Sequence, residues 1–164
     1  MDRLWSPWRM AYIEAAHEEP EGCLFCELLA KGDDESSFIL ARDGAAFALL
    51  NAYPYNPGHL MVAPTRHVGE IEQLDEGELL ATGRLVQRAV AALREEMSPH
   101  GFNLGANLGR VAGAGIPGHL HWHVVPRWNG DTNFMPVVGE TRVLPESLED
   151  TYRRLRPRFA SSSR

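Results

Sequence analysis

Three histidines alternate with apolar residues in the segment His119-Leu120-His121-Trp122-His123. On a β-strand alternate side chains point to the same face, so the three imidazoles would project together at intervals of roughly 6–7 Å, while Leu120 and Trp122 face the other way. Histidine is an uncommon core residue, and three buried together would all need hydrogen-bond partners. We therefore interpret this segment as a strand with one chemical face and one core face.

Two kinds of chemistry fit three imidazoles on one face. They can bind a metal ion, or they can act themselves as acid, base and nucleophile, and the spacing alone does not decide. The preceding residues 107–118 are rich in glycine, which lets backbone N–H groups approach an anion closely. This loop matches neither the Walker nor the dinucleotide-binding fingerprint. An anion-binding loop beside imidazoles nevertheless favours chemistry at phosphorus.

Cys23 and Cys26 are the only cysteines and form a Cys-x-x-Cys pair. The N-terminal residues do not develop the apolar segment of a signal peptide, so we expect a reduced, cytoplasmic protein whose cysteines are ligands rather than a disulfide. A zinc site has four ligands, so two further side chains must be found before the pair can be interpreted as a metal site.

The composition excludes several classes of protein. With 164 residues the chain is long enough for one full core and too short for two ordinary domains. Its 16 basic and 22 acidic side chains give a net charge of −6, which predicts no partner among nucleic acids or anionic membranes. No apolar run approaches the length that spans a bilayer. Any bound phosphate must therefore be held by local groups.

The chemical segment needs a sheet and helices to position it. Apolar periodicity and turn residues predict a hairpin from residues 38–41 and 45–50, a strand at 60–63 and a long amphipathic helix at 75–97. Further strands are expected at 102–108 and 120–126, with a short helix beginning at Pro7 and a last helix over about 145–156. This order predicts an α+β domain on a mainly antiparallel sheet.

The segment His119 to Val125 is similar to the histidine-triad signature, in which three alternating histidines precede two apolar residues. Residues 50–64 and 126–131 agree with the same family, so the chain resembles the histidine-triad (HIT) superfamily over about residues 23–135. The resemblance implies a five-stranded HIT-like fold in one domain, residues 1–164, with an N-terminal arm (1–22), a core (23–135) and a C-terminal extension (136–164). It also implies a homodimer.

The resemblance assigns roles to individual residues. It makes His121 the nucleophile and His123 the group that protonates the leaving group, with His59 as a supporting fourth histidine. Asn51 would contact the ribose. Phosphate contacts would come from Asn107 and from the backbone of Gly113, Ala114 and Gly115. The family often has serine or glutamine in this loop, where Gly115 and Ile116 stand here, so backbone groups must hold more of the anion.

Some triad proteins hold zinc with a cysteine pair and two histidines, and the matching residues here are Cys23, Cys26, His67 and His119. This zinc would be structural. Because His119 would bind the metal, His121 and His123 would remain for catalysis.

The extension after the motif resembles the Fhit and diadenosine-tetraphosphate phosphorylase branch. The resemblance therefore implies attack at the α-phosphate of dinucleoside polyphosphates, such as diadenosine tri- and tetraphosphate, through a covalent nucleotidyl-histidine. Water or phosphate would then resolve this intermediate. Three alternatives stay open: a phosphoramidase of the Hint type, a nucleotide-binding sensor without turnover, and a hydrolase with a catalytic metal on the three histidines.

Overall fold

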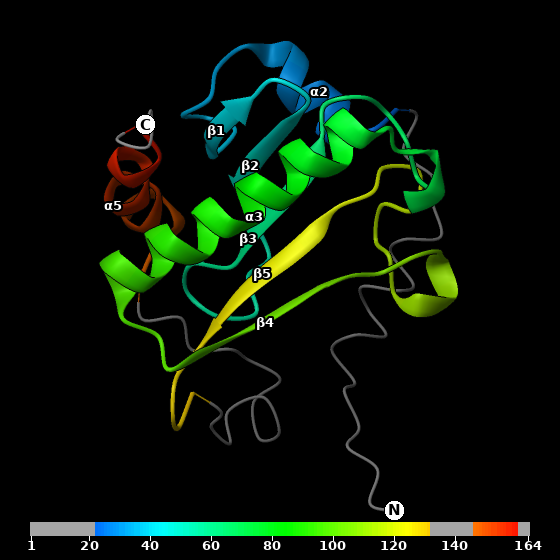
Figure 1. The fold of residues 1–164 in the computed structure, drawn as a ribbon. Coiled ribbons are helices and arrows are strands. Elements are labelled where there is room, and N and C mark those ends of the chain that lie inside the picture. The colour runs from blue at the N-terminus through cyan, green and yellow to red at the C-terminus, as the bar shows by residue number, and fades with distance from the viewer. Residues whose placement is uncertain (1–21, 132–145, 161–164) are drawn as a thin grey trace, which may run out of the picture.

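The computed structural model describes residues 22–131 and 146–160, and they form an antiparallel five-stranded sheet with helices on both faces (Figure 1). The strands lie in the order β1-β2-β3-β5-β4, so the last strand in sequence lies inside the sheet. The predicted α+β fold is confirmed. In chain order the elements are α2 (Leu24–Lys31), β1 (Ile39–Asp43), β2 (Ala46–Leu50), β3 (Leu60–Pro64), the 3₁₀ turn η1 (Ile71–Gln73), α3 (Glu76–Met97), β4 (Gly101–Ala106), the 3₁₀ turn η2 (Arg110–Ala112), β5 (Trp122–Arg127) and α5 (Leu148–Ala160).

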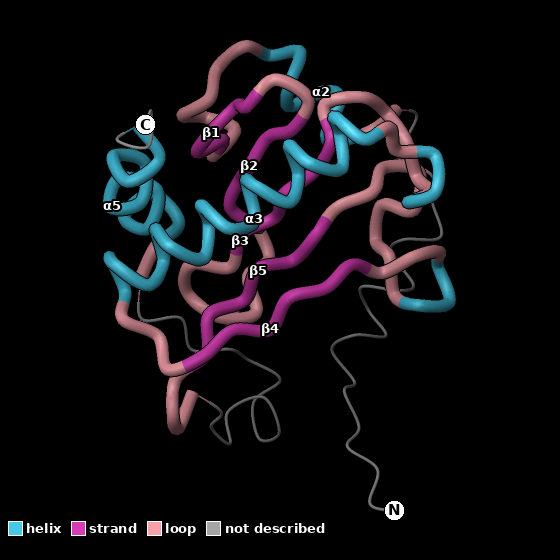
Figure 2. Tube along the Cα trace, viewed as in Figure 1, coloured by secondary structure: helices cyan, strands magenta, loops and turns pink. Residues whose placement is uncertain are grey.

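Side chains alternate between the two faces of the sheet along the central strands, and this alternation divides the core into two layers. Leu60 and Val62 of β3 pack on α3 and α5, whereas Met61 and Ala63 pack with Phe25 of α2 on the opposite face. Strands β2 and β3 are buried along their whole length, since helices cover both of their faces. Figure 2 shows the long helix α3 crossing the sheet beside α5. Among the described helices, none is long and apolar enough to cross a membrane.

Helix α3 confirms the strongest periodicity in the sequence. Its N-terminus has a capping box, in which the Asp75 side chain accepts a hydrogen bond from Glu78 N–H at 2.8 Å and Glu78 accepts one from Asp75 N–H at 3.0 Å. Leu85, Ala89 and Leu93 recur every four residues and are fully buried. The helix therefore spans almost the predicted residues 75–97.

Helix α2 is not among the elements that the sequence predicts. Phe25, Leu28 and Leu29 have helical spacing and pack on the sheet, and this spacing was the signal available in the sequence. The cysteines therefore lie one at the N-cap and one in the first turn of a helix. The short helix expected to begin at Pro7 lies outside the described residues.

The last helix was placed too early, over about 145–156. It begins at Leu148, after Ser147, whose hydroxyl accepts a hydrogen bond from Asp150 N–H at 3.1 Å. It also continues through Pro157 to Ala160. A proline inside a helix is unfavourable, but burial of Phe159 against the sheet, where it is 4% exposed, stabilises this last turn.

The strands that carry the site also have shifted bounds. The segment expected as a strand over 120–126 becomes regular only at Trp122, and the one expected over 102–108 ends at Ala106. Strand β5 pairs with β3 from Trp122 to Val124 and with β4 from Trp122 to Arg127. Before Trp122 the chain leaves the ladder, and Leu120 N–H donates instead to Val68 O at 2.7 Å.

The docking of α5 on the sheet gives a test of the fold. Leu155 is fully buried in the core beneath α5, so Leu155→Ala removes buried apolar surface and leaves a cavity. We expect the free energy of unfolding to fall by about 2–5 kcal/mol in urea titrations. Arg153→Ala on the exposed side of the same helix is the control and should change it by less than about 0.5 kcal/mol. Equal effects would show that α5 is not docked as described.

Candidate functional site

The histidines of the motif divide into two groups. His123 lies on β5 opposite Met61 of β3, on the face of the sheet that carries α2. His121 precedes β5, and its ring lies 5.0 Å from that of His123 between ring centroids. The ring of His119 lies instead with His67 and the two cysteines. His119 and His121 are buried, and the predicted common strand covers only His123, because the ladder starts at Trp122.

His121 is held in one orientation by its own backbone. Its Nδ1 lies 2.8 Å from the carbonyl oxygen of His119, so Nδ1 carries the proton and donates it to that carbonyl. The ring of Phe25 in α2 packs against it with centroids 5.1 Å apart. Nε2 of neutral His121 therefore holds a lone pair, as a nucleophilic nitrogen requires.

A chain of hydrogen bonds fixes the proton positions of His59 and His123. Tyr55 N–H donates to His59 Nδ1 at 3.0 Å, and Asn51 Nδ2 approaches the same atom at 3.4 Å, so this nitrogen is the acceptor. The proton of His59 is then on Nε2 and is donated to His123 Nδ1 at 3.0 Å. Neutral His123 must therefore carry its own proton on Nε2. The two catalytic candidates present opposite chemistry, a lone pair on His121 and a donor on His123.

Burial keeps these imidazoles neutral. Loss of solvation on burial lowers the pKa of His121. The hydrogen bond to the His119 carbonyl raises it, but this effect is the smaller of the two. Burial first and the nearby His121 second lower the pKa of His123 to about 4. Burial also lowers the pKa of His119. At neutral pH all three rings are therefore uncharged. The position of the proton on each ring decides which nitrogen donates a hydrogen bond and which accepts one.

The loop before β3 braces His59 from several sides. Asn51 N–H donates to His59 O at 2.9 Å, and His59 N–H donates to Asn56 O at 3.1 Å. The Asn56 side chain donates to Pro126 O at 3.0 Å and to Asp131 at 2.8 Å, which ties the loop to the end of β5. Gly58 has φ +77°, and a Cβ there would lie 2.9 Å from Leu93, so only glycine fits this turn.

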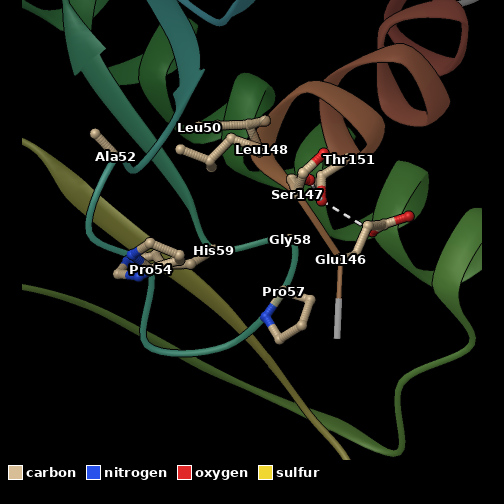
Figure 3. Close-up of a pocket in the computed structure, with 10 residues that line it drawn as sticks. All are labelled: Leu50, Ala52, Pro54, Pro57, Gly58, His59, Glu146, Ser147, Leu148 and Thr151. Carbon is tan, nitrogen blue, oxygen red and sulfur yellow. Dashed lines mark hydrogen bonds between the residues drawn. The ribbon is translucent and has the colours of Figure 1, made fainter. Parts of the chain in front are cut away.

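His59 also lines a cavity of about 140 Å³ between this loop and the start of α5 (Figure 3). Leu50, Pro54 and Leu148 form part of its wall, and Thr151 donates to Glu146 at its rim. The wall is largely apolar. The cavity therefore borders His59, whereas His123 is not part of its lining.

The glycine-rich loop contains the residues expected to bind phosphate. Asn107 Nδ2 donates to Gly113 O at 3.2 Å. Gly113 N–H and Ala114 N–H donate within the loop, to Arg110 O at 2.9 Å and Gly109 O at 3.3 Å. In the described part of the chain, the amide of Gly115 makes no such bond. Gly113 N–H and Ala114 N–H can therefore bind phosphate only if they give up these hydrogen bonds within the loop.

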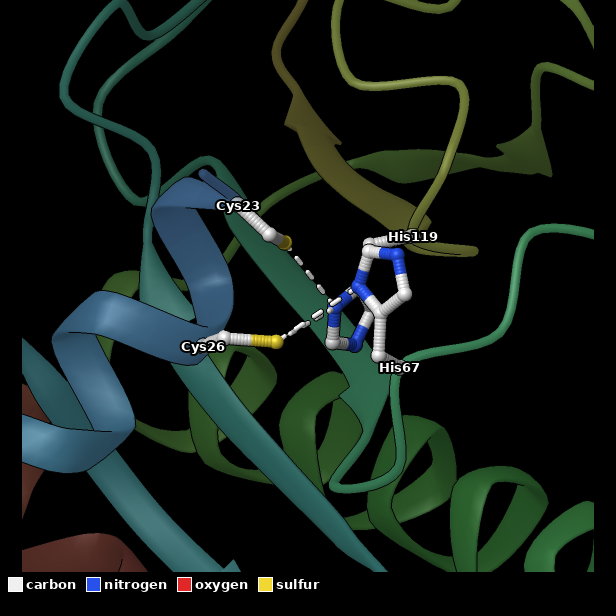
Figure 4. Close-up of side chains that lie close together, drawn as sticks. All are labelled: Cys23, Cys26, His67 and His119. Carbon is white, nitrogen blue, oxygen red and sulfur yellow. Dashed lines mark hydrogen bonds between the residues drawn. The ribbon is translucent and has the colours of Figure 1, made fainter. Parts of the chain in front are cut away.

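Two cysteines and two histidines from three separate segments come together at the N-terminal end of α2 (Figure 4). Cys23 and Cys26 come from α2, His67 from the segment after β3, and His119 from the segment before β5. Their ligand atoms all lie within 4.8 Å of one another. The sequence prediction that these four residues meet is confirmed, and the cluster could hold a metal ion.

Three distances between ligand atoms of this cluster are close to those around a tetrahedral ion. Ligand atoms around a zinc ion with bonds of about 2.0–2.3 Å are roughly 3.4–3.8 Å apart. Here His119 Nδ1 lies 3.3 Å from Cys23 Sγ and 3.7 Å from Cys26 Sγ, and His67 Nδ1 lies 3.5 Å from Cys26 Sγ. His119 Nε2–H donates to Pro64 O at 2.8 Å, which leaves Nδ1 as the lone pair that faces the thiols.

An ion pair between half-exposed Arg66 and buried Glu78 fixes the segment that carries His67. Arg66 binds both carboxylate oxygens of Glu78 at 2.7 Å, and Glu78 is 5% exposed at the start of α3. The Arg66 guanidinium lowers the pKa of Glu78 to about 2. Gly69 lies against the segment before His119, where a Cβ would be 2.7 Å from Pro117 O. The segments of His67 and His119 are thus held in close contact.

Several residues of the site escaped sequence reasoning. Phe25, between the cysteines, packs on both His119 and His121, and its helical spacing was the only signal. Tyr55 lies over His59 with ring centroids 4.7 Å apart. Asn56, Asp131 and the Arg66–Glu78 pair act through contacts between segments far apart in sequence, which no local pattern reveals.

Comparison with known proteins agrees with this arrangement. The HIT domain family matches residues 33–130. The chain is 42% identical to AP-4-A phosphorylase of Mycobacterium tuberculosis over 167 aligned residues, which cover 98% of this chain and 85% of that protein. A zinc-bound histidine triad family protein of Mycobacterium smegmatis superposes with a TM-score of 0.68 at 26% identity, covering 85% of this chain and 94% of that one. A hypothetical histidine triad nucleotide-binding protein of Sulfolobus tokodaii also gives a TM-score of 0.68 at 26% identity, over 84% of this chain and 92% of the other. The chain therefore belongs to the HIT domain family, as the sequence predicted, and is an enzyme of that family.

Proposed function

We propose that the protein cleaves dinucleoside polyphosphates such as diadenosine tetraphosphate at the α-phosphorus, through a nucleotide bound covalently to His121. The observation that carries this proposal is the fixed pair of opposite ring nitrogens, a lone pair on His121 Nε2 and a proton on His123 Nε2. The relative named AP-4-A phosphorylase, 42% identical, supports the substrate class. Asn51, Asn107 and the backbone of Gly113, Ala114 and Gly115 are the proposed nucleotide contacts.

In the first step, the lone pair of His121 Nε2 attacks the α-phosphorus. A nitrogen–phosphorus bond forms, and the bond from phosphorus to the bridging oxygen breaks with its electron pair on that oxygen. His121 becomes a cation that still donates from Nδ1 to the His119 carbonyl. His123 donates its Nε2 proton in a hydrogen bond to the departing oxygen. A phosphate ester has a second pKa of about 6, so this oxygen can leave as an anion near neutral pH.

In the second step, water or phosphate attacks the phosphorus and the bond to His121 Nε2 breaks. Water gives a nucleoside monophosphate, and phosphate gives a nucleoside diphosphate. The departed product of a dinucleoside tetraphosphate is a nucleoside triphosphate in both cases. The relative's name supports phosphorolysis as the proposed outcome.

We assign zinc to Cys23, Cys26, His67 and His119, as a structural ion. The donor set of two sulfurs and two imidazole nitrogens suits zinc, and the zinc-bound relative supports the choice. Bound zinc would hold α2 and the His67 segment against His119, whose carbonyl orients His121. A catalytic metal on all three motif histidines is disfavoured, since His119 points its Nδ1 at the cysteines and its Nε2 at Pro64 O.

A phosphoramidase of the Hint type remains the second candidate, because it would use the same histidine pair. It differs in substrate, so turnover of an adenosine phosphoramidate far above that of diadenosine tetraphosphate would favour it. The homodimer, the cytoplasmic location, the absence of nucleic-acid partners and the division of the chain into arm, core and extension stay predictions from the sequence.

Product analysis tests the reaction directly. Incubation with diadenosine tetraphosphate should give AMP and ATP without phosphate and ADP and ATP with phosphate, since the same nucleotidyl-histidine is resolved by different acceptors. Diadenosine triphosphate should give AMP and ADP without phosphate and two ADP with phosphate. His121→Ala should lower kcat by roughly three orders of magnitude or more and abolish the labelled covalent intermediate in a quenched reaction. His100→Ala, a histidine outside the cluster and the catalytic group, is the control. Full activity of His121→Ala would refute the assignment of the nucleophile.

Metal analysis tests the cluster. We expect about one zinc per chain in the purified protein. A Cys23→Ser, Cys26→Ser variant should lose the metal and melt at a lower temperature, because two of four ligands are gone. His100→Ala should retain it. Retention of zinc by the cysteine variant would move the metal to another site and revive the catalytic-metal alternative.

The lowered pKa of His123 predicts a specific loss of stability in acid. The unfolded chain takes up a proton on this ring near the ordinary pKa of about 6.5, but the folded protein does so only near 4, so the free energy of unfolding falls as pH drops through this window. We expect His123 to contribute a loss on the order of 1–3 kcal/mol between pH 7 and pH 4. Urea unfolding of His123→Asn should show a correspondingly flatter pH dependence. Identical pH dependence in the two proteins would contradict a buried, neutral His123.

A further inference from the structure

A row of neighbouring rings, in contact at tilted or T-shaped angles, leads from beside the cysteine–histidine cluster toward solvent. Successive ring centroids lie 5.1 Å apart from Phe25 to His121, 5.0 Å from His121 to His123, 5.1 Å from His123 to His59 and 4.7 Å from His59 to Tyr55. The row changes in exposure along its length. His121 is 5% exposed, whereas Tyr55, the last ring, is 46% exposed.

The chemistry gives this row a direction. The attacked phosphorus must lie at His121 Nε2 and the departing oxygen at His123 Nε2, so the leaving group begins beside His123. The exposed ring of Tyr55 also lies near His123, with centroids 6.1 Å apart. The leaving group of a dinucleoside tetraphosphate is a triphosphate that ends in a second nucleoside. This second nucleoside is therefore within reach of the loop that carries Tyr55.

Two exposed tyrosines stand on this loop. Tyr53 is 78% exposed, and Pro54 separates it from Tyr55. Single exposed aromatic side chains are ordinary on protein surfaces. The backbone that carries this pair is held by hydrogen bonds. Tyr53 N–H donates to Asn51 Oδ1 at 2.9 Å, and Tyr55 N–H donates to His59 Nδ1 at 3.0 Å. Asn56 ties the loop to β5. A braced backbone lowers the entropic cost of binding a ligand.

We propose that Tyr53 and Tyr55 form a binding surface for the purine base of the leaving nucleotide, and that this surface makes the enzyme prefer dinucleotides over mononucleoside polyphosphates. The inference rests on the proposed function, which it deepens by naming what recognises the second nucleoside. A base has a flat π-face that stacks on a tyrosine ring without any specific hydrogen bond. The surface therefore selects for the presence of a base rather than for its identity.

The test compares two substrates that differ only in the second nucleoside. Diadenosine tetraphosphate and adenosine 5′-tetraphosphate have the same four phosphates and place the same nucleotide on His121, so the ratio of their kcat/KM values reports recognition of the distal adenosine. We expect Tyr53→Leu, Tyr55→Leu and the double variant to lower this ratio, by about 5- to 100-fold in the double variant. The change should appear mainly in KM for the dinucleotide.

Three controls separate stacking from damage to the site. Tyr53→Phe and Tyr55→Phe keep the ring and should keep the wild-type ratio. Leu79→Ala removes an exposed apolar side chain of α3 and should change neither substrate. Because Tyr55 also packs on His59, its leucine variant can slow both substrates, but Tyr53→Leu alters a mostly exposed ring and tests the ratio alone.

The outcomes distinguish this inference from the function on which it rests. Cleavage of both substrates with the same ratio in wild type and in every leucine variant would overturn the tyrosine surface and leave the proposed function intact. If wild type cleaves neither substrate, with or without phosphate, the proposed function and this inference both fail. A lowered ratio in the leucine variants, retained with phenylalanine, supports the inference.

Discussion

The hydrogen bond from His121 Nδ1 to the carbonyl of His119 is the contact on which the site depends. His119 takes part in two structures at once, because its ring belongs to the cysteine–histidine cluster and its carbonyl orients the candidate nucleophile. Movement of the His119 ring would turn the peptide that follows it, and so change the direction of the lone pair on His121. The cysteine–histidine cluster and the proposed catalytic pair are therefore joined through a single residue, although no member of the cluster needs to touch the substrate.

The histidines of the site differ in which ring nitrogen carries the proton, and not in charge. A protein with net charge −6 repels a polyanionic substrate at long range, so attraction must come from donors at short range. Burial keeps His121 and His123 neutral, and the hydrogen bonds of Tyr55, His59 and His119 decide which nitrogen accepts and which donates. A neutral ring with a lone pair attacks phosphorus, whereas a protonated one could not.

The sequence predicted the cysteine–histidine cluster and the long helix better than the contacts around them. Alternation of the motif histidines, the cysteine pair and the family resemblance led to all four members of the cluster, and the periodicity of residues 75–97 led to α3. The sequence did not reveal that β5 starts at Trp122, because pairing with β3 and β4 sets that boundary, and long segments of chain separate both strands from β5. Phe25, Asn56 and the Arg66–Glu78 pair were missed for the same reason: their partners are distant in sequence and only the folded chain brings them together.

The position of β5 affects how the chain folds during its synthesis. This strand is the last of the five in sequence, yet it lies between β3 and β4, so the sheet cannot close until residue 127 has been synthesised. A nascent chain that ends before His119 contains the cysteine helix and the His59 loop but neither the proposed nucleophile nor the fourth member of the cysteine–histidine cluster. Contacts of such large sequence separation form late and slow the search for the native topology. The proposed nucleotide chemistry is thus confined to chains in which β5 already lies between β3 and β4.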